Sequence, residues 1–119
     1  YALHITPESE YGPEFKKPLD ELGIAPGAVI ELSGAFYTDS PGPGAKLVVS
    51  IERNGKSIYW ISANVSDFTG VPENWFRVFL AAAVPLHITG DEILKIYCWN
   101  EKKESLWMDD VKINIYSAR

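Results

Sequence analysis

The chain contains few of the residues on which catalytic and disulfide-bonded sites depend. Its 119 residues include one cysteine, Cys98, and two histidines, His4 and His87, which lie far apart and outside any catalytic motif. One cysteine excludes an internal disulfide, and its alternation with Leu94 and Ile96 predicts a buried, inert thiol. GxSxG, HExxH and CxxC motifs are absent, and none of the 16 acidic residues has a recognisable catalytic setting. We therefore expect no enzymatic activity.

Basic charge and long apolar runs are also lacking. The 16 acidic and 11 basic residues give a net charge of -5, and no basic stripe occurs, so we expect no nucleic-acid partner. No apolar run approaches the roughly 20 residues of a membrane-spanning helix. The sequence begins at Tyr1 rather than at Met. We interpret it as a monomeric module of a larger protein, from which any signal peptide or anchor has been removed.

Short alternating segments separated by turns make up most of the chain. Apolar residues alternate from Ile30 to Phe36, from Leu47 to Ile51 and from Val111 to Ile115, and we expect them to be almost fully buried. Asn54-Gly55 is a strong hairpin signal. The only helical pattern is a single turn at Pro18–Gly23. Residues 1–119 are therefore predicted to form one all-β domain, a two-sheet antiparallel sandwich of jelly-roll type with seven or eight strands.

Aromatic residues are abundant, at 13% of the chain. They suit the core of a β-sandwich, and they also suit a surface that stacks rings on sugars. Alternation places Tyr97 and Trp99 on a solvent-side face, and Tyr59 and Trp60 on opposite faces, so that one of the latter pair points outward.

A further aromatic residue, Trp75, shares a face with Arg77. Together with Tyr97 and Trp99, these two residues are candidates for one exposed aromatic and polar surface. The alternative is that the tryptophans cap the ends of the sandwich or lie under loops. The predicted sugar-binding residues are Tyr59, Trp60, Trp75, Arg77, Tyr97 and Trp99.

The end of the chain carries a family resemblance. Leu94–Tyr116 reads as two strands around a charged turn, and the second has the form aromatic-x-Asp-Asp-Val-x-Ile-x-Ile. It resembles the last strand of the β-jelly-roll domains among carbohydrate-binding modules, the galactose-binding-like group. Val29–Trp60 resembles the middle strands of such a domain, and Asn74–Pro85 resembles the strand that follows. The resemblance implies an accessory module of secreted or surface proteins, often bacterial, that binds a polysaccharide or oligosaccharide.

The same resemblance implies a structural calcium ion. Modules of this group often hold calcium between an acidic residue at the start of the last strand and acidic or carbonyl groups near the N-terminus. Here Asp109 or Asp110 matches the first position, and Glu8, Glu10 and Glu14 are candidates for the second. Clustered carboxylates and loop carbonyls can supply the hard oxygens that calcium requires. The alternative is that the two aspartates form a solvated turn at the start of a strand.

Two functions of different class thus stay open. One is a non-catalytic carbohydrate-binding module with weak glycan binding through exposed aromatic rings. The other is a structural or protein-interaction sandwich that acts as a spacer in a larger surface protein. Coplanar exposed rings on a concave face favour the first function, whereas buried rings favour the second.

Overall fold

The computed structural model describes residues 3–5, 11–38, 44–68, 75–100 and 106–116. Within these ranges it contains eight strands and two single-turn 3-10 helices, η1 (Asp20–Leu22) and η2 (Val65–Asp67). The strands are β1 (Leu3–Ile5), β2 (Tyr11–Pro18), β3 (Val29–Thr38), β4 (Ala45–Arg53), β5 (Lys56–Asn64), β6 (Phe76–Ala83), β7 (Ile93–Asn100) and β8 (Leu106–Tyr116). Among the described residues, no helix is long and apolar enough to cross a membrane.

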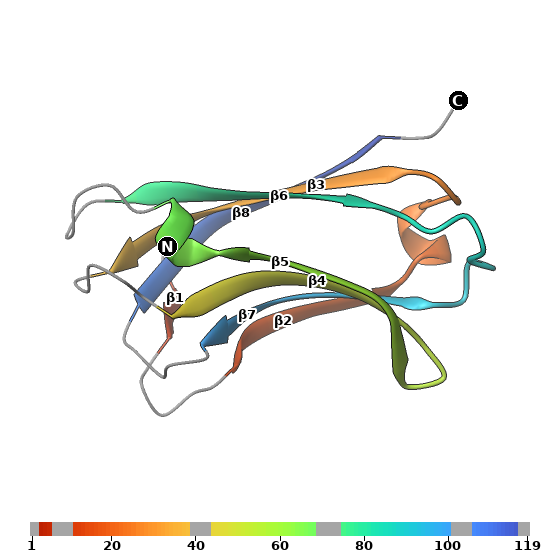
Figure 1. Cartoon of the computed structure of the whole chain (residues 1–119), viewed down its shortest axis with the longest axis horizontal. Helices are drawn as coiled ribbons and strands as arrows, with labels where there is room; N and C mark the ends of the chain where they lie inside the picture. The colour runs from red at the N-terminus through yellow and green to blue at the C-terminus, as the bar shows by residue number, and fades with distance from the viewer. Residues whose placement is uncertain (1–2, 6–10, 39–43, 69–74, 101–105, 117–119) are drawn as a thin grey trace.

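The strands form two antiparallel layers (Figure 1). Sheet A has the order β1-β8-β3-β6, and sheet B has the order β2-β7-β4-β5. Because consecutive strands mostly alternate between the two sheets, neighbours within a sheet are distant in sequence, as expected for a jelly roll. The predicted all-β sandwich is confirmed.

The β4–β5 hairpin shows how local sequence sets part of this topology. Asn54 and Gly55 both have positive φ, 52° and 79°, and they join the two strands directly. This is the backbone that a type I′ turn requires and that asparagine and glycine adopt at little cost. The predicted hairpin is therefore confirmed.

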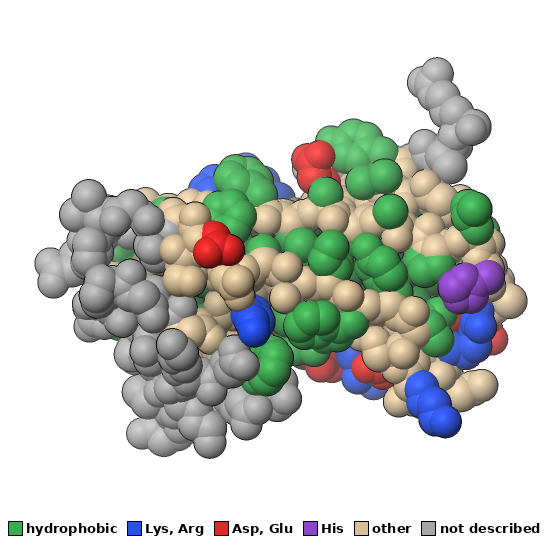
Figure 2. Space-filling model, in the orientation of Figure 1, with side chains coloured by type: hydrophobic (Ala, Val, Ile, Leu, Met, Phe, Trp, Pro, Cys, Tyr) green, Lys and Arg blue, Asp and Glu red, His purple; other side chains and the backbone are tan. Residues whose placement is uncertain are grey.

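The core lies between the inner faces of the two sheets. Leu32 and Phe36 on β3 pack toward Leu47, Val49 and Ile51 on β4, and all five side chains are essentially inaccessible to solvent. Along one edge of the molecule, hydrophobic side chains run along the middle of the surface between the two layers (Figure 2). The predicted burial of the β3 and β4 alternation is confirmed.

The predicted burial of the β8 alternation is wrong. Val111 is 43% exposed, and Ile113 and Ile115 are only partly buried. β1 pairs only with Leu106–Met108, so the rest of β8 has β3 on one side and no described strand on the other. A β-bulge adds to the opening, because the register of β8 against β3 shifts near Asp110, whose φ is 51°.

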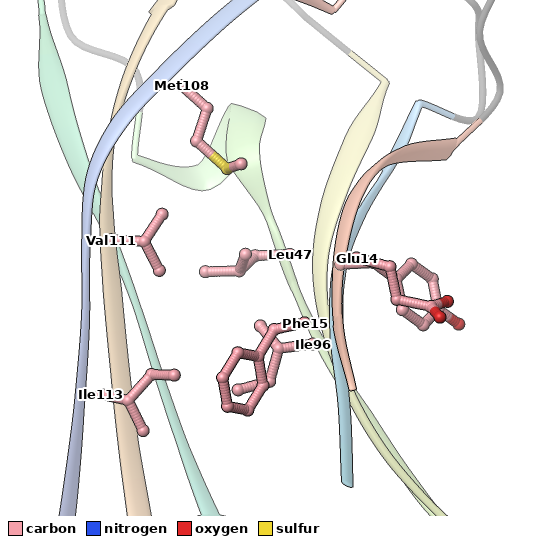
Figure 3. Close-up of a pocket in the computed structure, with 8 residues that line it drawn as sticks. Glu14, Phe15, Leu47, Ile96, Met108, Val111 and Ile113 are labelled. Carbon is pink, nitrogen blue, oxygen red and sulfur yellow. The ribbon is translucent and has the colours of Figure 1, made fainter. Parts of the chain in front are cut away.

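This open edge leads to an apolar groove between the sheets. Figure 3 shows Met108, Val111 and Ile113 of sheet A facing side chains of sheet B across it. The groove has a volume of ≈ 340 Å³. The sheet B side chains that line it are Phe15, Leu47 and Ile96. The side chain of Glu14 points away from the groove, toward the outer face of sheet B (Figure 3).

Candidate functional site

The structure separates the predicted sugar-binding residues onto opposite faces of the sandwich. Trp60, Tyr97 and Trp99 belong to β5 and β7 in sheet B, whereas Trp75 and Arg77 belong to the β6 segment in sheet A. The prediction that Tyr97, Trp99, Trp75 and Arg77 share one surface is therefore wrong. Alternation within a strand gives the face of that strand only. Which strands share a sheet depends on pairings between distant segments.

Alternation on β5 resolves the choice between Tyr59 and Trp60. Trp60 points outward and is 44% exposed, whereas Tyr59 packs against the core and is half-buried. Tyr59 is therefore a packing residue, and Trp60 is the surface residue of the pair.

Trp60, Tyr97 and Trp99 form what we call the sheet B aromatic cluster. The indole Nε1 of Trp60 donates a hydrogen bond to the Tyr97 hydroxyl at 3.3 Å. The rings of Trp60 and Trp99 meet edge to face, with centroids 6.4 Å apart and an interplanar angle of 80°. The Lys46 Nζ lies 5.2 Å from the centroid of the Trp99 ring, within cation–π range. The two indole rings are therefore not coplanar: the edge of one ring meets the face of the other.

The central strand β4 lies beneath this cluster. Val48 and Ser50 are on the outer side of β4, where they pair with Tyr97 and Trp60 in the strand register. Both are nevertheless buried, because the neighbouring side chains cover them. The cluster therefore packs on β4 on the side that faces the sheet. Its other side is open to solvent at Trp60.

Charged groups surround the ring of Tyr97 on the same face. Glu14, Glu52 and Lys95 line a shallow hollow of ≈ 220 Å³ together with Tyr97. Lys95 Nζ forms an ion pair with Glu52 Oε2 at 3.2 Å. These carboxylate and ammonium groups are suitable hydrogen-bond partners for hydroxyl groups, since they offer both acceptors and donors.

A second group of rings, the sheet A aromatic cluster, lies on the opposite face. It consists of Tyr37 on β3, Trp107 on β8 and Trp75 immediately before β6. Tyr37 contacts both tryptophans, with centroid distances of 5.7 Å to Trp75 and 5.4 Å to Trp107. Trp75 is 49% exposed. Tyr37 and Trp107 were not among the residues predicted to bind sugar. Their alternation signal is present, but their proximity depends on the pairing of β3 with β8, in which they are direct partners.

Arg77 lies on the same face as this cluster and has a defined structural role. Its Nη1 donates to Asp110 Oδ2 at 3.1 Å, and its Nη2 donates to the Asp110 carbonyl at 3.0 Å and to Ser33 Oγ at 2.9 Å. The guanidinium thus holds the bulged residue of β8 against β3 and β6. Arg77 fixes polar groups beside the rings.

The predicted calcium ligands are only partly described. Glu8 and Glu10 lie outside the described residues, and no three His, Cys, Asp or Glu side chains gather as a metal group within the described ranges. The Asp110 carboxylate is paired with Arg77, and Lys112 Nζ lies 3.7 Å from it, so two cations compete with any metal there. Asp109 Oδ1 accepts a hydrogen bond from the Asp110 amide.

A buried carboxylate, Glu92, lies at the opposite end of the molecule, near the β4–β5 hairpin. Arg53 Nε donates to Glu92 Oε2 at 3.1 Å, and the Thr89 and Gly90 amides donate at 3.0 and 2.8 Å. Burial alone would raise the pKa of Glu92. The hydrogen bonds from Arg53 and from the two amides outweigh burial and lower this pKa to about 2. Glu92 is therefore an ionised structural anchor, and its burial gave no signal in the sequence.

The single cysteine is confirmed as a core residue. Cys98 is fully buried, and burial raises the pKa of its thiol to about 12. A thiol with this pKa is not a nucleophile at neutral pH, because the reactive species is the thiolate.

Comparisons with solved structures agree with the predicted fold. A CBM4 structure matches with a TM-score of 0.54 and 12% identity over 86% of this chain, which spans 59% of that protein. The EclA C-terminal domain, a sugar-binding protein, matches with a TM-score of 0.46 and 15% identity, over 96% of this chain and 77% of that one. A family 16 carbohydrate-binding module matches with a TM-score of 0.45 and 13% identity, over 92% of this chain and 82% of that one.

These similarities concern the fold and not the function. Only the CBM4 similarity exceeds a TM-score of 0.5, and at its low identity it shows the fold alone. No protein-family model and no curated protein matches the chain. The chain therefore has a carbohydrate-binding-module-like β-sandwich, as the sequence predicted, and its function has to be argued from its own surface.

Proposed function

We propose that this chain is a non-catalytic carbohydrate-binding module of a secreted or surface-attached protein, and that it binds glycans weakly through the sheet B aromatic cluster. The observation that supports this most directly is the convergence of Trp60, Tyr97 and Trp99 on one outer face, although no inter-sheet packing requires them there. Large aromatic side chains gathered on a surface are typical of interaction sites.

The polar groups around the rings suit a carbohydrate ligand. A sugar ring has an apolar face that can lie on an indole, and hydroxyl groups at its edge that need both donors and acceptors. Glu14, Glu52 and Lys95 supply both beside Tyr97. A purely apolar protein partner would bury these charged groups without replacing the hydrogen bonds that they make to water, at a cost in binding free energy.

We expect the glycan to be neutral. Near the rings, the positive charges of Lys46 and Lys95 are matched by the negative charges of Glu14 and Glu52. The chain as a whole carries a net charge of -5, which repels an anionic polymer at long range.

Affinity is expected to be modest. The surface is open, and the ordering of a flexible glycan offsets much of the free energy gained by stacking. We expect dissociation constants of about micromolar to millimolar, which correspond to roughly -8 to -4 kcal/mol.

A glycan array followed by tryptophan-fluorescence titration tests the proposal. Trp60→Ala should weaken binding with little loss of stability, because its ring is partly exposed. Trp99→Ala should also weaken binding, but at a larger cost in stability, because Trp99 is more buried and lies opposite Lys46 on β4. Tyr116→Ala is the matched control, since it removes a ring that is 52% exposed on β8 and should leave binding unchanged.

Two results would count against the proposal. Absence of binding to any neutral plant, algal or host polysaccharide would favour the structural-spacer alternative. Undiminished glycan binding by Trp60→Ala would show that the site lies elsewhere.

A further inference from the structure

We propose that the sheet A aromatic cluster, Tyr37, Trp75 and Trp107, is a second carbohydrate site, so that one domain holds two separate chains of a neutral glycan. This inference rests on the proposed function for the nature of the ligand. It concerns a different surface with different residues. A second site would allow the domain to cross-link glycan chains, which one site cannot do.

The three rings form a continuous row across adjacent strands. Tyr37 lies in the middle of the row and pairs directly with Trp107 of β8. Trp75 extends the row on the β6 side, since Phe76 is the register partner of Phe36. The ring planes are tilted by 49° between Tyr37 and Trp75 and by 74° between Tyr37 and Trp107. Backbone pairing of the strands therefore fixes most of the geometry before any ligand arrives, which lowers the ordering cost of binding.

The hydrophobic core does not explain this row. On the inner side of the same strands, Phe36 and Phe76 already form a stacked pair, with centroids 6.4 Å apart. The sheet A aromatic cluster lies on the other side, where Trp75 keeps about half of its surface in solvent. Burial of apolar surface stabilises a fold, but rings that stay at the surface contribute little of this stabilisation. A gathering of such rings therefore indicates an interaction site.

Fixed polar groups lie beside the row. Arg77 is two residues beyond Trp75, on the same face, and it holds the Asp110 carboxylate and the Ser33 hydroxyl through the hydrogen bonds described above. Two cations, Arg77 and Lys112, lie beside the carboxylate of Asp110, and the adjacent carboxylate of Asp109 brings the group to two positive and two negative charges. The surface therefore offers rings and hydrogen-bonding groups without a local excess of charge, which matches a neutral glycan better than a charged polymer.

The two aromatic clusters face away from each other. Sheet A and sheet B are the two layers of the sandwich (Figure 1). The alternation of burial along the strands places the two clusters on the outer faces of these sheets. A straight stretch of glycan cannot touch both clusters at once. Two occupied sites would therefore connect two chains, or two segments of one long chain, and would raise the apparent affinity for a dense polysaccharide above that of either site alone.

The distribution of tryptophan makes a direct test possible. The chain has four tryptophans, and each cluster contains two: Trp60 and Trp99 on sheet B, and Trp75 and Trp107 on sheet A. In a ¹⁵N-labelled sample, the four indole N–H resonances, assigned with single Trp→Phe variants, report on each face separately. The probes are soluble oligosaccharides from the neutral polysaccharide that gives the strongest signal on the array.

We expect the Trp75 and Trp107 resonances to shift with saturation. Trp75→Ala, which removes its own resonance, should abolish the Trp107 shift while the Trp60 and Trp99 shifts remain. If Trp75→Ala unfolds the chain, Tyr37→Ala removes the central ring of the row and keeps all four indole reporters. Shifts confined to Trp60 and Trp99 would overturn the second site and leave the proposed function intact. Shifts confined to Trp75 and Trp107 would support the second site and overturn the sheet B assignment. No shift with any glycan would overturn both proposals.

Light scattering on the intact polysaccharide tests the consequence of having two sites. The wild-type chain should cross-link the polymer and raise the scattering, whereas Trp60→Ala and Trp75→Ala should each bind it without cross-linking. Phe79→Ala is the control, because it removes a ring that is 56% exposed on β6 but lies outside the row. Equal scattering by wild type and Trp75→Ala would overturn the proposal of two sites.

Discussion

The buried carboxylate of Glu92 permits a quantitative stability prediction. Glutamine has nearly the same shape, so Glu92→Gln tests the charge and the hydrogen bonds rather than the packing. In the native chain, Glu92 Oε2 accepts hydrogen bonds from Arg53 Nε and from the Thr89 amide, and Oε1 accepts from the Thr89 and Gly90 amides.

The expected cost follows from the number of donors. The amide of glutamine replaces one acceptor oxygen with an NH₂ donor, so at least one buried N–H loses its partner, which costs about 1–3 kcal/mol. The remaining hydrogen bonds lose their charge-assisted character, which adds roughly 1 kcal/mol. We therefore expect Glu92→Gln to lower the free energy of unfolding by about 2–4 kcal/mol at neutral pH.

Chemical denaturation at several pH values measures this difference. The pKa of Glu92 is lower in the folded chain than its usual value of 4.5, so its contribution to stability is present above about pH 4.5 and is lost as the pH falls toward 2. The gap between wild type and Glu92→Gln should therefore be widest at neutral pH and should narrow at pH 3.

A matched control separates this effect from the loss of any glutamate charge. Glu21 pairs with Lys17 at 3.2 Å, but both side chains are about half exposed. Glu21→Gln should cost less than about 0.5 kcal/mol. The reasoning would be refuted if the two variants lost similar stability, or if the Glu92→Gln gap stayed constant from pH 7 to pH 3.

Three further predictions concern the core, a loop glycine and calcium. Leu32→Ala should lower the free energy of unfolding by about 2–5 kcal/mol. Ile113→Ala should lower it by roughly half as much, because Ile113 is only partly buried. Equal losses of the two variants in chemical denaturation would contradict the open β8 edge. Gly90→Ala should lower the melting temperature, because the φ of Gly90 is +109° and a new Cβ would lie 2.1 Å from Asp20 Oδ1. An unchanged melting temperature would show that this loop rearranges freely. We also predict that calcium raises the melting temperature and that Asp109→Asn removes the rise; an unchanged melting temperature after chelation of calcium-loaded protein would end the calcium hypothesis.

Much of the fold could be predicted from local sequence patterns. The period of two on β3 and β4 identified their inward residues, and Asn54-Gly55 identified the hairpin, because both depend on neighbours along the chain. The same rule failed for Val111. Its face was correctly identified, but its burial depends on whether another strand covers that side of β8.

The candidate sites divide in the same way. Alternation correctly predicted that Tyr97 and Trp99 leave the core and that one of Tyr59 and Trp60 points outward. It could not assign Trp75 to the other sheet, and it gave no reason to join Trp75 with residues 38 positions before it and 32 positions after it, Tyr37 and Trp107. These contacts arise only when β6, β3 and β8 pair.

The sequence by itself therefore determined the fold class, the face of most strand residues and the positions of the main turns. These properties follow from backbone geometry over a few consecutive residues. The tertiary structure alone decided which aromatic rings meet, that most of β8 has only β3 beside it among the described strands, and that Glu92 is a buried ion held by Arg53, 39 residues away. The physical reason is that strand order and burial depend on contacts between segments far apart in the chain, and a local pattern carries no information about those partners.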